Sequence, residues 1–276
     1  MSRAAGRPVP PAAPRRARKR FGQHFLEPAW VEKVVAAVDP QPGDTFLEIG
    51  PGRGALTIRL APRVARVIAV EIDRDLAAAL PGAVPTPLHV VEGDVLDTDL
   101  AALLASEPAP VRVVGNLPYN VATPILFRLL AAAGGGRQLS DATVMLQKEV
   151  ADRVVARPGS RDYGSLAVHV ALDADAQLVL TLPPGAFRPP PKVTSGVVRL
   201  RFRPPAVDVG DRAVFERLVR GAFQQRRKTL LNALGPVAGA LGRTAADLIE
   251  RAGVDPQIRP GEVPLAGFAA LSRAVL

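Results

Sequence analysis

The chain has 276 residues, of which 48% are hydrophobic and 22% charged, as is typical of a globular protein with a large core and one or two domains. It contains no cysteine, which excludes disulfides, thiolate metal sites and a cysteine nucleophile. The formal net charge is +9, and the basic excess lies in residues 1–20 and 204–276. This distribution fits a polyanionic partner bound from two sides, and it is also compatible with a role in solubility alone.

The first 20 residues form an arm rich in proline, alanine and arginine, which we expect to be disordered. The arm lacks the apolar stretch of a secretory signal, and no apolar run in the chain is long enough to span a bilayer. We therefore expect a cytoplasmic protein with no membrane partner. Beyond the arm, Phe25 and Leu26 precede a helix that Pro28 opens, onto which they would pack as a hydrophobic staple.

The first strand of a predicted α/β domain spans Phe46–Ile49 and runs into the glycine-rich loop Gly50–Gly54. A helix is expected from Ala55 onward. Glycine lets the backbone approach a ligand closely, and a helix N-terminus favours a carboxylate or a phosphate. Because Gly50, Gly52 and Ala55 also match a dinucleotide-binding fingerprint, a nicotinamide dehydrogenase remains an alternative at this point.

Acidic residues end the next two predicted strands. The strand Val67–Val70 ends at Glu71, which follows Gly50 by 21 residues. An acid in this register binds the ribose hydroxyls of a nucleotide. A third strand, Leu88–Val91, leads to Asp94, whose carboxylate can accept the amine of a bound adenine.

The stretch of residues 111–119 predicts a buried strand followed by a loop at its carboxyl end, where open α/β sheets bind ligands. The exocyclic amine of a nucleobase is a poor nucleophile, and a protein can activate it by accepting both of its N–H protons. Asn116 offers a side-chain oxygen, and Leu117 offers a carbonyl whose direction Pro118 restricts. Tyr119 offers a face on which the base can stack. Taken alone, these four residues are also compatible with an ordinary turn.

Further elements follow in alternation. The pattern predicts helices over residues 124–133 and 147–155, and strands over residues 142–146, 166–171, 177–182 and 193–202. Three prolines stiffen the segment Phe187–Lys192, which can aim Phe187 and Lys192 at a site or act as a rigid linker. Pro204 and Pro205 mark a domain boundary. The predicted parts are a basic arm (1–20), an α/β domain (21–203) and a small helical domain (204–276).

The C-terminal part has a helical pattern. Apolar residues from Phe215 onward follow a 3.6-residue period, and we expect this helix to continue through the cationic cluster Arg226–Lys228. A variant capping box at Thr244 and a C-cap at Gly253 predict another helix. A last helix is expected from Pro264 to the end.

These motifs together resemble the ribosomal RNA adenine N6-dimethyltransferase family, and most closely its bacterial small-subunit members. The resemblance covers nearly everything from Arg18 to the C-terminus. The motifs that carry it are Phe21–Leu26, Glu48–Gly52, Val70–Glu71, Gly93–Asp94, Asn116–Tyr119, Leu146–Val150, Phe187–Val193 and Gln225–Thr229. The resemblance implies a Rossmann-like α/β sheet of the class I S-adenosylmethionine-dependent methyltransferases and a C-terminal helical domain that binds RNA.

The resemblance also implies S-adenosylmethionine as the cofactor. Gly50 would lie beneath its methionine part, Glu71 would bind its ribose, and Asp94 would bind its adenine amine. The residues that the resemblance assigns to the cofactor are His24, Leu26, Gly50, Glu71, Asp94 and Asn116. The family often has Asn at the position of His24.

The implied reaction is methyl transfer to N6, performed twice on each of two adjacent adenines near the 3′ end of small-subunit rRNA in a pre-ribosomal particle. Each adenine must leave its stack to reach the pocket, where Tyr119 and Phe187 would sandwich it. The residues assigned to catalysis are Asn116, Leu117, Pro118, Tyr119 and Phe187. No metal is expected, and the enzyme is expected to be a monomer.

Two alternatives share part of this resemblance. A large-subunit rRNA methyltransferase that confers macrolide resistance has the same upstream motifs, but the segments Phe187–Lys192 and Gln225–Thr229 favour the small-subunit enzyme. The second alternative is a non-catalytic RNA-binding assembly factor. Four intact residues argue against lost activity, although not against an added role in assembly: Asn116, Tyr119, Glu71 and Asp94.

Overall fold

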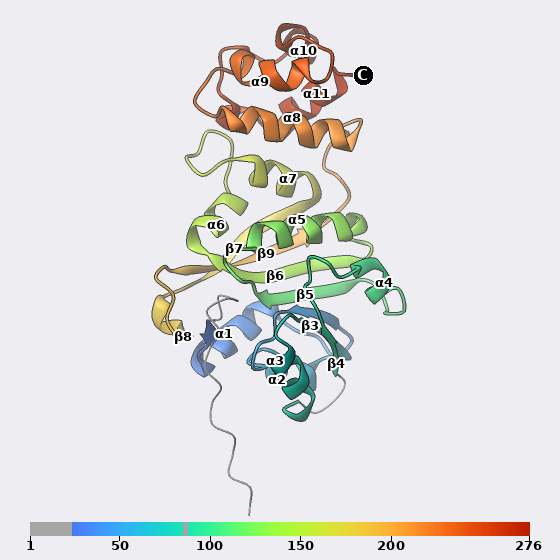
Figure 1. The fold of residues 1–276 in the computed structure, drawn as a ribbon, viewed down its shortest axis with the longest axis vertical. Coiled ribbons are helices and arrows are strands. Elements are labelled where there is room, and N and C mark those ends of the chain that lie inside the picture. Colours follow the sequence, from blue (N-terminus) through green and yellow to red (C-terminus); the bar gives the residue numbers. More distant parts are fainter. Residues whose placement is uncertain (1–23, 85–87) are drawn as a thin grey trace, which may run out of the picture.

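A seven-stranded sheet forms the centre of the computed structural model, which describes residues 24–84 and 88–276 (Figure 1). The predicted basic arm lies outside the described residues. The strand order is β4-β3-β2-β5-β6-β9-β7, in which β4 to β6 pair in parallel and the last two pairings are antiparallel. The strands are β2 (Thr45–Ile49), β3 (Arg66–Glu71), β4 (Leu88–Glu92), β5 (Val111–Asn116), β6 (Leu139–Gln147), β7 (Ala174–Leu182) and β9 (Ser195–Phe202). Chain order reverses between β2 and β5, so this is the place where a ligand site is expected.

Helices cover both faces of the sheet. They are α1 (Pro28–Val38), α2 (Thr57–Leu60), α3 (Arg74–Ala79), α4 (Leu100–Leu104), α5 (Ala122–Ala132), α6 (Lys148–Val154) and α7 (Ser165–Asp173). Successive residues of β2 point to opposite faces, so that Phe46 packs with α1 and α2 while Leu47 packs with α4, α5 and α6. Every residue of β2 is buried, as expected for a strand covered on both faces. No described helix is long and apolar enough to cross a membrane.

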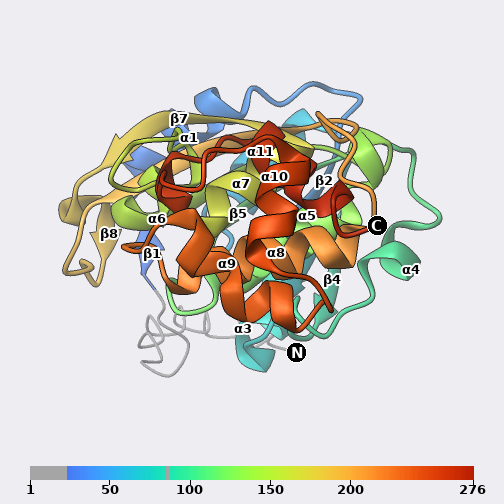
Figure 2. The ribbon, with the colours of Figure 1, turned by 90° about the horizontal axis from the view of Figure 1, so that it is seen from above.

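Four helices form the C-terminal part above α7 (Figures 1 and 2). They are α8 (Arg212–Gln224), α9 (Leu230–Gly239), α10 (Ala245–Ala252) and α11 (Leu265–Arg273). Their apolar faces share a separate core that includes Phe215 and Phe268. The predicted boundaries of α10 are confirmed, because the Thr244 side chain caps its first turn and Gly253 ends it in the left-handed region with φ 63°.

The predicted strand over residues 166–171 is wrong, because these residues belong to helix α7. Leu166 and Val170 pack into the core of the α/β part, whereas Val168 and Leu172 pack into the core of the C-terminal helices. A helix buried on opposite sides is apolar all round and loses the periodicity that identifies a helix in a sequence. The C-terminal helical unit therefore shares α7 with the α/β part.

Two local predictions also need correction. Helix α8 ends at Gln224, so the cluster Arg226–Lys228 lies in the following turn and not on the helix. The prediction that Phe25 and Leu26 only pack onto the helix as a staple is incomplete, because they also form the short strand β1 (Phe25–Leu26), which pairs with β8 (Phe187–Arg188). This pairing joins two segments that are about 160 residues apart in the chain.

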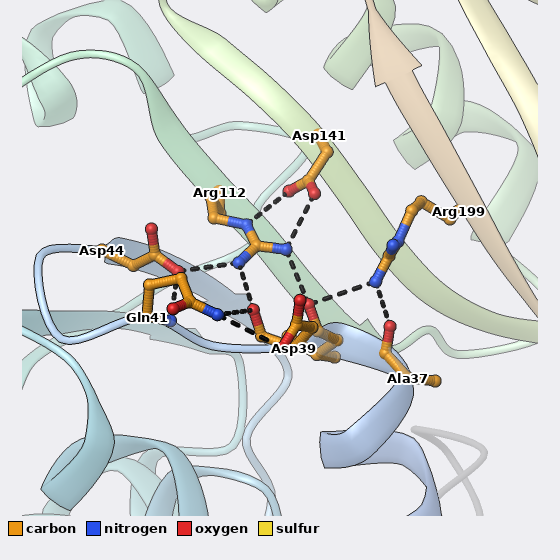
Figure 3. A network of polar contacts seen from close by, with 8 residues as sticks. Ala37, Asp39, Gln41, Asp44, Arg112, Asp141 and Arg199 are labelled. Atoms are coloured by element: carbon orange, nitrogen blue, oxygen red, sulfur yellow. Dashed lines mark hydrogen bonds and ion pairs between the residues drawn. The ribbon is translucent and has the colours of Figure 1, made fainter.

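A polar network at the amino end of β5 fixes helix α1 to the sheet (Figure 3). Arg112 donates to both carboxylate oxygens of Asp141, at 3.0 and 2.9 Å, and to Asp44 at 2.7 Å. The same guanidinium donates to the carbonyls of Val38 and Asp39 at 2.7 and 2.9 Å, where α1 ends. Because α1 follows directly after β1, this network also supports the segment that borders the site described below.

Candidate active site

A cavity lies at the carboxyl ends of β2, β3 and β5, at the reversal of strand order. Eight of the ten site residues predicted from the sequence line it, and they are His24, Leu26, Gly50, Glu71, Asn116, Leu117, Pro118 and Tyr119. The cavity wall also includes residues that the sequence analysis did not assign to the site, among them Glu48, Ile72 and Met145. The tertiary structure thus brings together motifs that span almost a hundred residues of the chain.

The glycine loop presents its backbone to the cavity. Gly50 has φ +64°, and a Cβ atom added to it would meet no atom within 4 Å, so its main chain faces open space. Gly52 also has a positive φ, and its N–H donates to Glu71 Oε2 at 2.9 Å. The other oxygen of Glu71 accepts from the N–H of Asp73 at 2.9 Å. The carboxylate therefore ties the loop after β2 to the end of β3.

Two buried carboxylates border this loop. Burial raises the pKa of Glu71, and the hydrogen bonds from backbone N–H groups oppose that rise. Burial also raises the pKa of Glu48 to about 7; hydrogen bonding with Thr57 opposes this rise, and the nearby charge of Glu71 adds to it. Glu48 Oε2 is buried and has no hydrogen-bond partner among the described residues. The only sequence signal for Glu48 was its place as the first residue of the Glu48–Gly52 motif.

Asn116 ends β5 at the floor of the cavity, and its side-chain Nδ2 donates to the backbone carbonyl of His24 at 2.7 Å. Only the amide nitrogen can donate to a carbonyl, so this contact assigns the orientation of the side chain. The amide oxygen of Asn116 is consequently kept for a different donor. Leu117, the next residue, is held by a hydrogen bond from its N–H to the carbonyl of Met145 at 3.2 Å.

Tyr119 is fixed from two sides. Its hydroxyl lies 2.6 Å from the hydroxyl of Ser195, which is fully buried on β9. Its ring stacks with the imidazole of His24, with 5.7 Å between ring centroids and 25° between planes. The imidazole Nδ1 of His24 in turn donates to the carbonyl of Pro189 at 2.7 Å. Burial raises the pKa of the Tyr119 hydroxyl, so it is protonated at neutral pH. No local sequence signal identified Ser195.

Phe187, Lys192 and Asp94 do not line the cavity. Phe187 is fully buried, pairs with Leu26 in the β1–β8 ribbon and packs into the core, whereas Lys192 is exposed. Asp94 Oδ1 accepts from the N–H of Leu96 at 2.9 Å and so stabilises the turn after β4. The proline-rich segment thus places the Phe187 ring in the core and not at the surface of the site.

The cationic turn after α8 contacts a loop of the α/β part. Arg226 donates to the carbonyls of Ser160 and Arg161, and the Gly159 N–H donates to the carbonyl of Gly261 at 2.8 Å. Arg227 and Lys228, the rest of the cluster, are exposed. The two parts of the molecule are therefore joined beside this basic turn.

Residues 15–259 match the family model described as ribosomal RNA adenine dimethylase. The chain is 46% identical over 261 residues to ribosomal RNA small subunit methyltransferase A of Acinetobacter baylyi, covering 93% of this chain and 92% of that protein. It is 48% identical over 263 residues to the protein of the same name from Methylibium petroleiphilum, covering 94% and 96% of the two chains.

Two solved structures share the fold over most of the chain. A dimethyladenosine transferase from Plasmodium falciparum has 25% sequence identity and a TM-score of 0.75, covering 90% of this chain and 96% of its own. The 23S rRNA methyltransferase ErmE has 26% identity and a TM-score of 0.64, covering 91% and 99%. These similarities confirm the predicted Rossmann-like methyltransferase sheet.

Proposed function

Since the chain belongs to the ribosomal RNA adenine dimethylase family, we propose that its cavity holds S-adenosylmethionine against the glycine loop and a target adenine against the loop after β5. The chain is a methyltransferase that dimethylates adenine in small-subunit rRNA and uses S-adenosylmethionine as its cofactor. Its curated relatives carry the name of the small-subunit enzyme, so the large-subunit alternative is set aside.

The residues around the glycine loop fit this cofactor. The open space beside Gly50 admits close approach of a ligand to the backbone, and the Glu71 carboxylate suits two ribose hydroxyls. The unpartnered oxygen of Glu48 suits the ammonium group of the methionine part. Ile72 lines the cavity with 43% of its surface exposed and offers an apolar face to an adenine ring. When bound, S-adenosylmethionine supplies the electrophilic methyl group.

The loop after β5 performs the activation of the target amine. The Nδ2–His24 hydrogen bond holds the Asn116 amide so that its oxygen would accept a hydrogen bond from one N6–H, and the Leu117 carbonyl would accept one from the other. The N6 proton that each methyl group replaces would be lost to water. Acceptance of both hydrogen bonds localises the nitrogen lone pair and directs it at the methyl group. This orientation of Asn116 is the observation that carries the proposal.

The other predicted residues take supporting roles in the proposal. Tyr119 offers a stacking face for the adenine, with its ring orientation fixed by Ser195. We keep Phe187 as the second stacking surface, a role that requires its buried ring to leave the core when the target base enters. We also keep Asp94 as the acceptor for the amine of the cofactor adenine, because the N–H of Leu96 bonds to Oδ1, one of its two carboxylate oxygens.

We further propose that the C-terminal helices and their basic turn bind the RNA backbone without reading its sequence. The basic arm would add phosphate contacts. The substrate would be a pre-ribosomal particle in the cytoplasm, the protein would act as a monomer, and its targets would be two adjacent adenosines near the 3′ end of the rRNA.

A labelled-cofactor assay tests this function. The full-length protein is incubated with labelled S-adenosylmethionine and small-subunit particles, large-subunit particles or naked rRNA, and the modified nucleotides are then mapped. We expect N6,N6-dimethyladenosine at two neighbouring positions of the small-subunit rRNA. Label confined to large-subunit rRNA would support the macrolide-resistance alternative, and RNA binding without transfer would support a non-catalytic assembly factor.

A further inference from the structure

His24 contacts both residues of the proposed target-base subsite. Its backbone carbonyl accepts from Asn116 Nδ2, and its imidazole stacks with the ring of Tyr119. His24, Asn116 and Tyr119 all line the same cavity, so the imidazole covers part of the Tyr119 ring at the cavity wall. An adenine placed with its amine at Asn116 would stack on this same face.

The two rings leave no room for a base between them. Stacked aromatic rings have centroids about 4.5 Å or more apart. The centroids of the His24 and Tyr119 rings are 5.7 Å apart in this structure. A base inserted between them in a parallel sandwich would need a considerably larger separation. The imidazole must leave before the adenine can stack on the cavity face of Tyr119.

We propose that His24 is a specificity-determining residue of the target-base subsite, because its imidazole and the target adenine compete for one face of Tyr119. This inference rests on the proposed function. Rotation of the imidazole would break its stack and its hydrogen bond to the Pro189 carbonyl, whereas the backbone bond to Asn116 would persist. Asn116 would thus remain oriented while the site accepts only a base that stacks better than the imidazole does.

The size of the effect follows from the contacts that the base must replace. A stacked aromatic pair and a neutral hydrogen bond each shift an equilibrium by roughly two- to tenfold. A weakly stacking base would then leave the subsite mostly closed. His24→Ala removes the competing ring and keeps the backbone carbonyl. His24→Phe is the matched control, since it keeps a competing ring but cannot bond to Pro189.

The test compares the contribution of the target base to binding in each variant. Small-subunit particles are reconstituted with rRNA that carries either adenine or an abasic ribose at the mapped target position. Their affinities for the full-length protein are measured with S-adenosylhomocysteine present to prevent turnover. The ratio of the two dissociation constants reports how strongly the base occupies its subsite.

We expect the adenine-to-abasic preference to rise by roughly four- to a hundredfold in His24→Ala, which removes both the stack and the hydrogen bond, and by only about two- to tenfold in His24→Phe, which loses the hydrogen bond alone. In a Tyr119→Ala background, His24→Ala should have no effect, because the contested face is gone. A lower preference in His24→Ala would mean that the imidazole supports binding of the base, and an unchanged preference would mean that it does not compete with the base. Either result overturns the proposal.

The controls separate this inference from the proposed function. Melting temperature and S-adenosylmethionine affinity of each variant show whether folding or the cofactor site has changed. If the wild-type protein neither prefers adenine nor transfers methyl groups to the particle, the proposed function fails. If the wild-type protein does both but the His24 variants show no change in preference, only the competition fails.

Discussion

Replacement of Asn116 by alanine tests the proposed chemistry most directly, because it removes two contacts with different kinetic consequences. The first is the 2.7 Å hydrogen bond to the His24 carbonyl, which exists before substrate binds. Its loss should cost about 0.5–1.5 kcal/mol in stability or ligand affinity. The second is the acceptor for the target amine, which is needed most as N6 attacks the methyl group.

The loss of this acceptor should lower the rate of transfer more than the affinity for substrate, because it acts mainly in the transition state. By analogy with the loss of one oxyanion-hole donor, we expect about 2.7–4 kcal/mol, or a rate roughly 10²–10³-fold lower. Tyr119→Ala should act differently, since it removes a stacking face worth about 1–3 kcal/mol. Tyr119→Phe keeps the ring, loses only the contact with Ser195, and should retain most activity.

Single-turnover transfer to a particle bound in advance separates these effects. S-adenosylmethionine must be saturating, because Asn116 also lines the cavity near the cofactor residues. Asn116→Asp is the matched control, since it keeps an acceptor of similar shape but cannot donate to the His24 carbonyl. Transfer at the wild-type rate by a folded Asn116→Ala protein would refute the proposed role of this loop.

The remaining predictions concern the cofactor, the RNA surface, the fold and pH. Glu71→Ala should weaken S-adenosylmethionine binding by about 1.5–3 kcal/mol, and calorimetry that finds no change in a folded variant would remove Glu71 from the site. Neutralising Arg227 and Lys228 should reduce the slope of log affinity for the particle against log salt by roughly 1.5–2 units, and an unchanged slope would mean that neither contacts a phosphate. Arg112→Ala should lower the free energy of unfolding by about 3 kcal/mol in urea denaturation, because it leaves two half-buried carboxylates without their cation; a loss below about 1 kcal/mol would show that solvent replaces it. The folded-state pKa of Glu48, about 7, lies above its unfolded value of 4.5, so its contribution to stability is present below pH 4.5 and is lost as pH rises through 7. Without cofactor, the wild-type protein should therefore lose up to about 3 kcal/mol relative to Glu48→Gln across this interval, and parallel stability curves would contradict the assignment.

The sequence by itself determined the α/β sheet and most of the cavity wall. Strands β2 and β5 are short buried runs that end in turn-forming residues, and such local patterns persist in the fold. In a parallel sheet, the carboxyl ends of adjacent strands meet at one edge, so motifs at those ends are brought together once the strands pair. This is why Gly50, Glu71 and Asn116 could be assigned to one site before any contact was known.

Local pattern did not decide elements that are packed on two sides or that depend on distant partners. Helix α7 is apolar on opposite sides because it contributes to two cores, so its sequence has no helical period. Helix α8 ends at Gln224 although the residues that follow are compatible with a helix. In the turn that follows, Arg226 donates to the carbonyls of two residues in the loop before α7. This tertiary contact cannot be recognised from the local sequence.

The detailed geometry of the target-base subsite was decided only by the tertiary structure. The β1–β8 pairing buries Phe187 and places His24 beside Asn116 and Tyr119. The contacts His24–Asn116, Tyr119–Ser195 and His24–Pro189 join residues 92, 76 and 165 positions apart. Side chains alone carry no signal for such contacts, since each hydrogen-bonding group and each ring has many possible partners. The partner is selected when the strands pair and the core closes, because only then do the two groups lie within bonding distance.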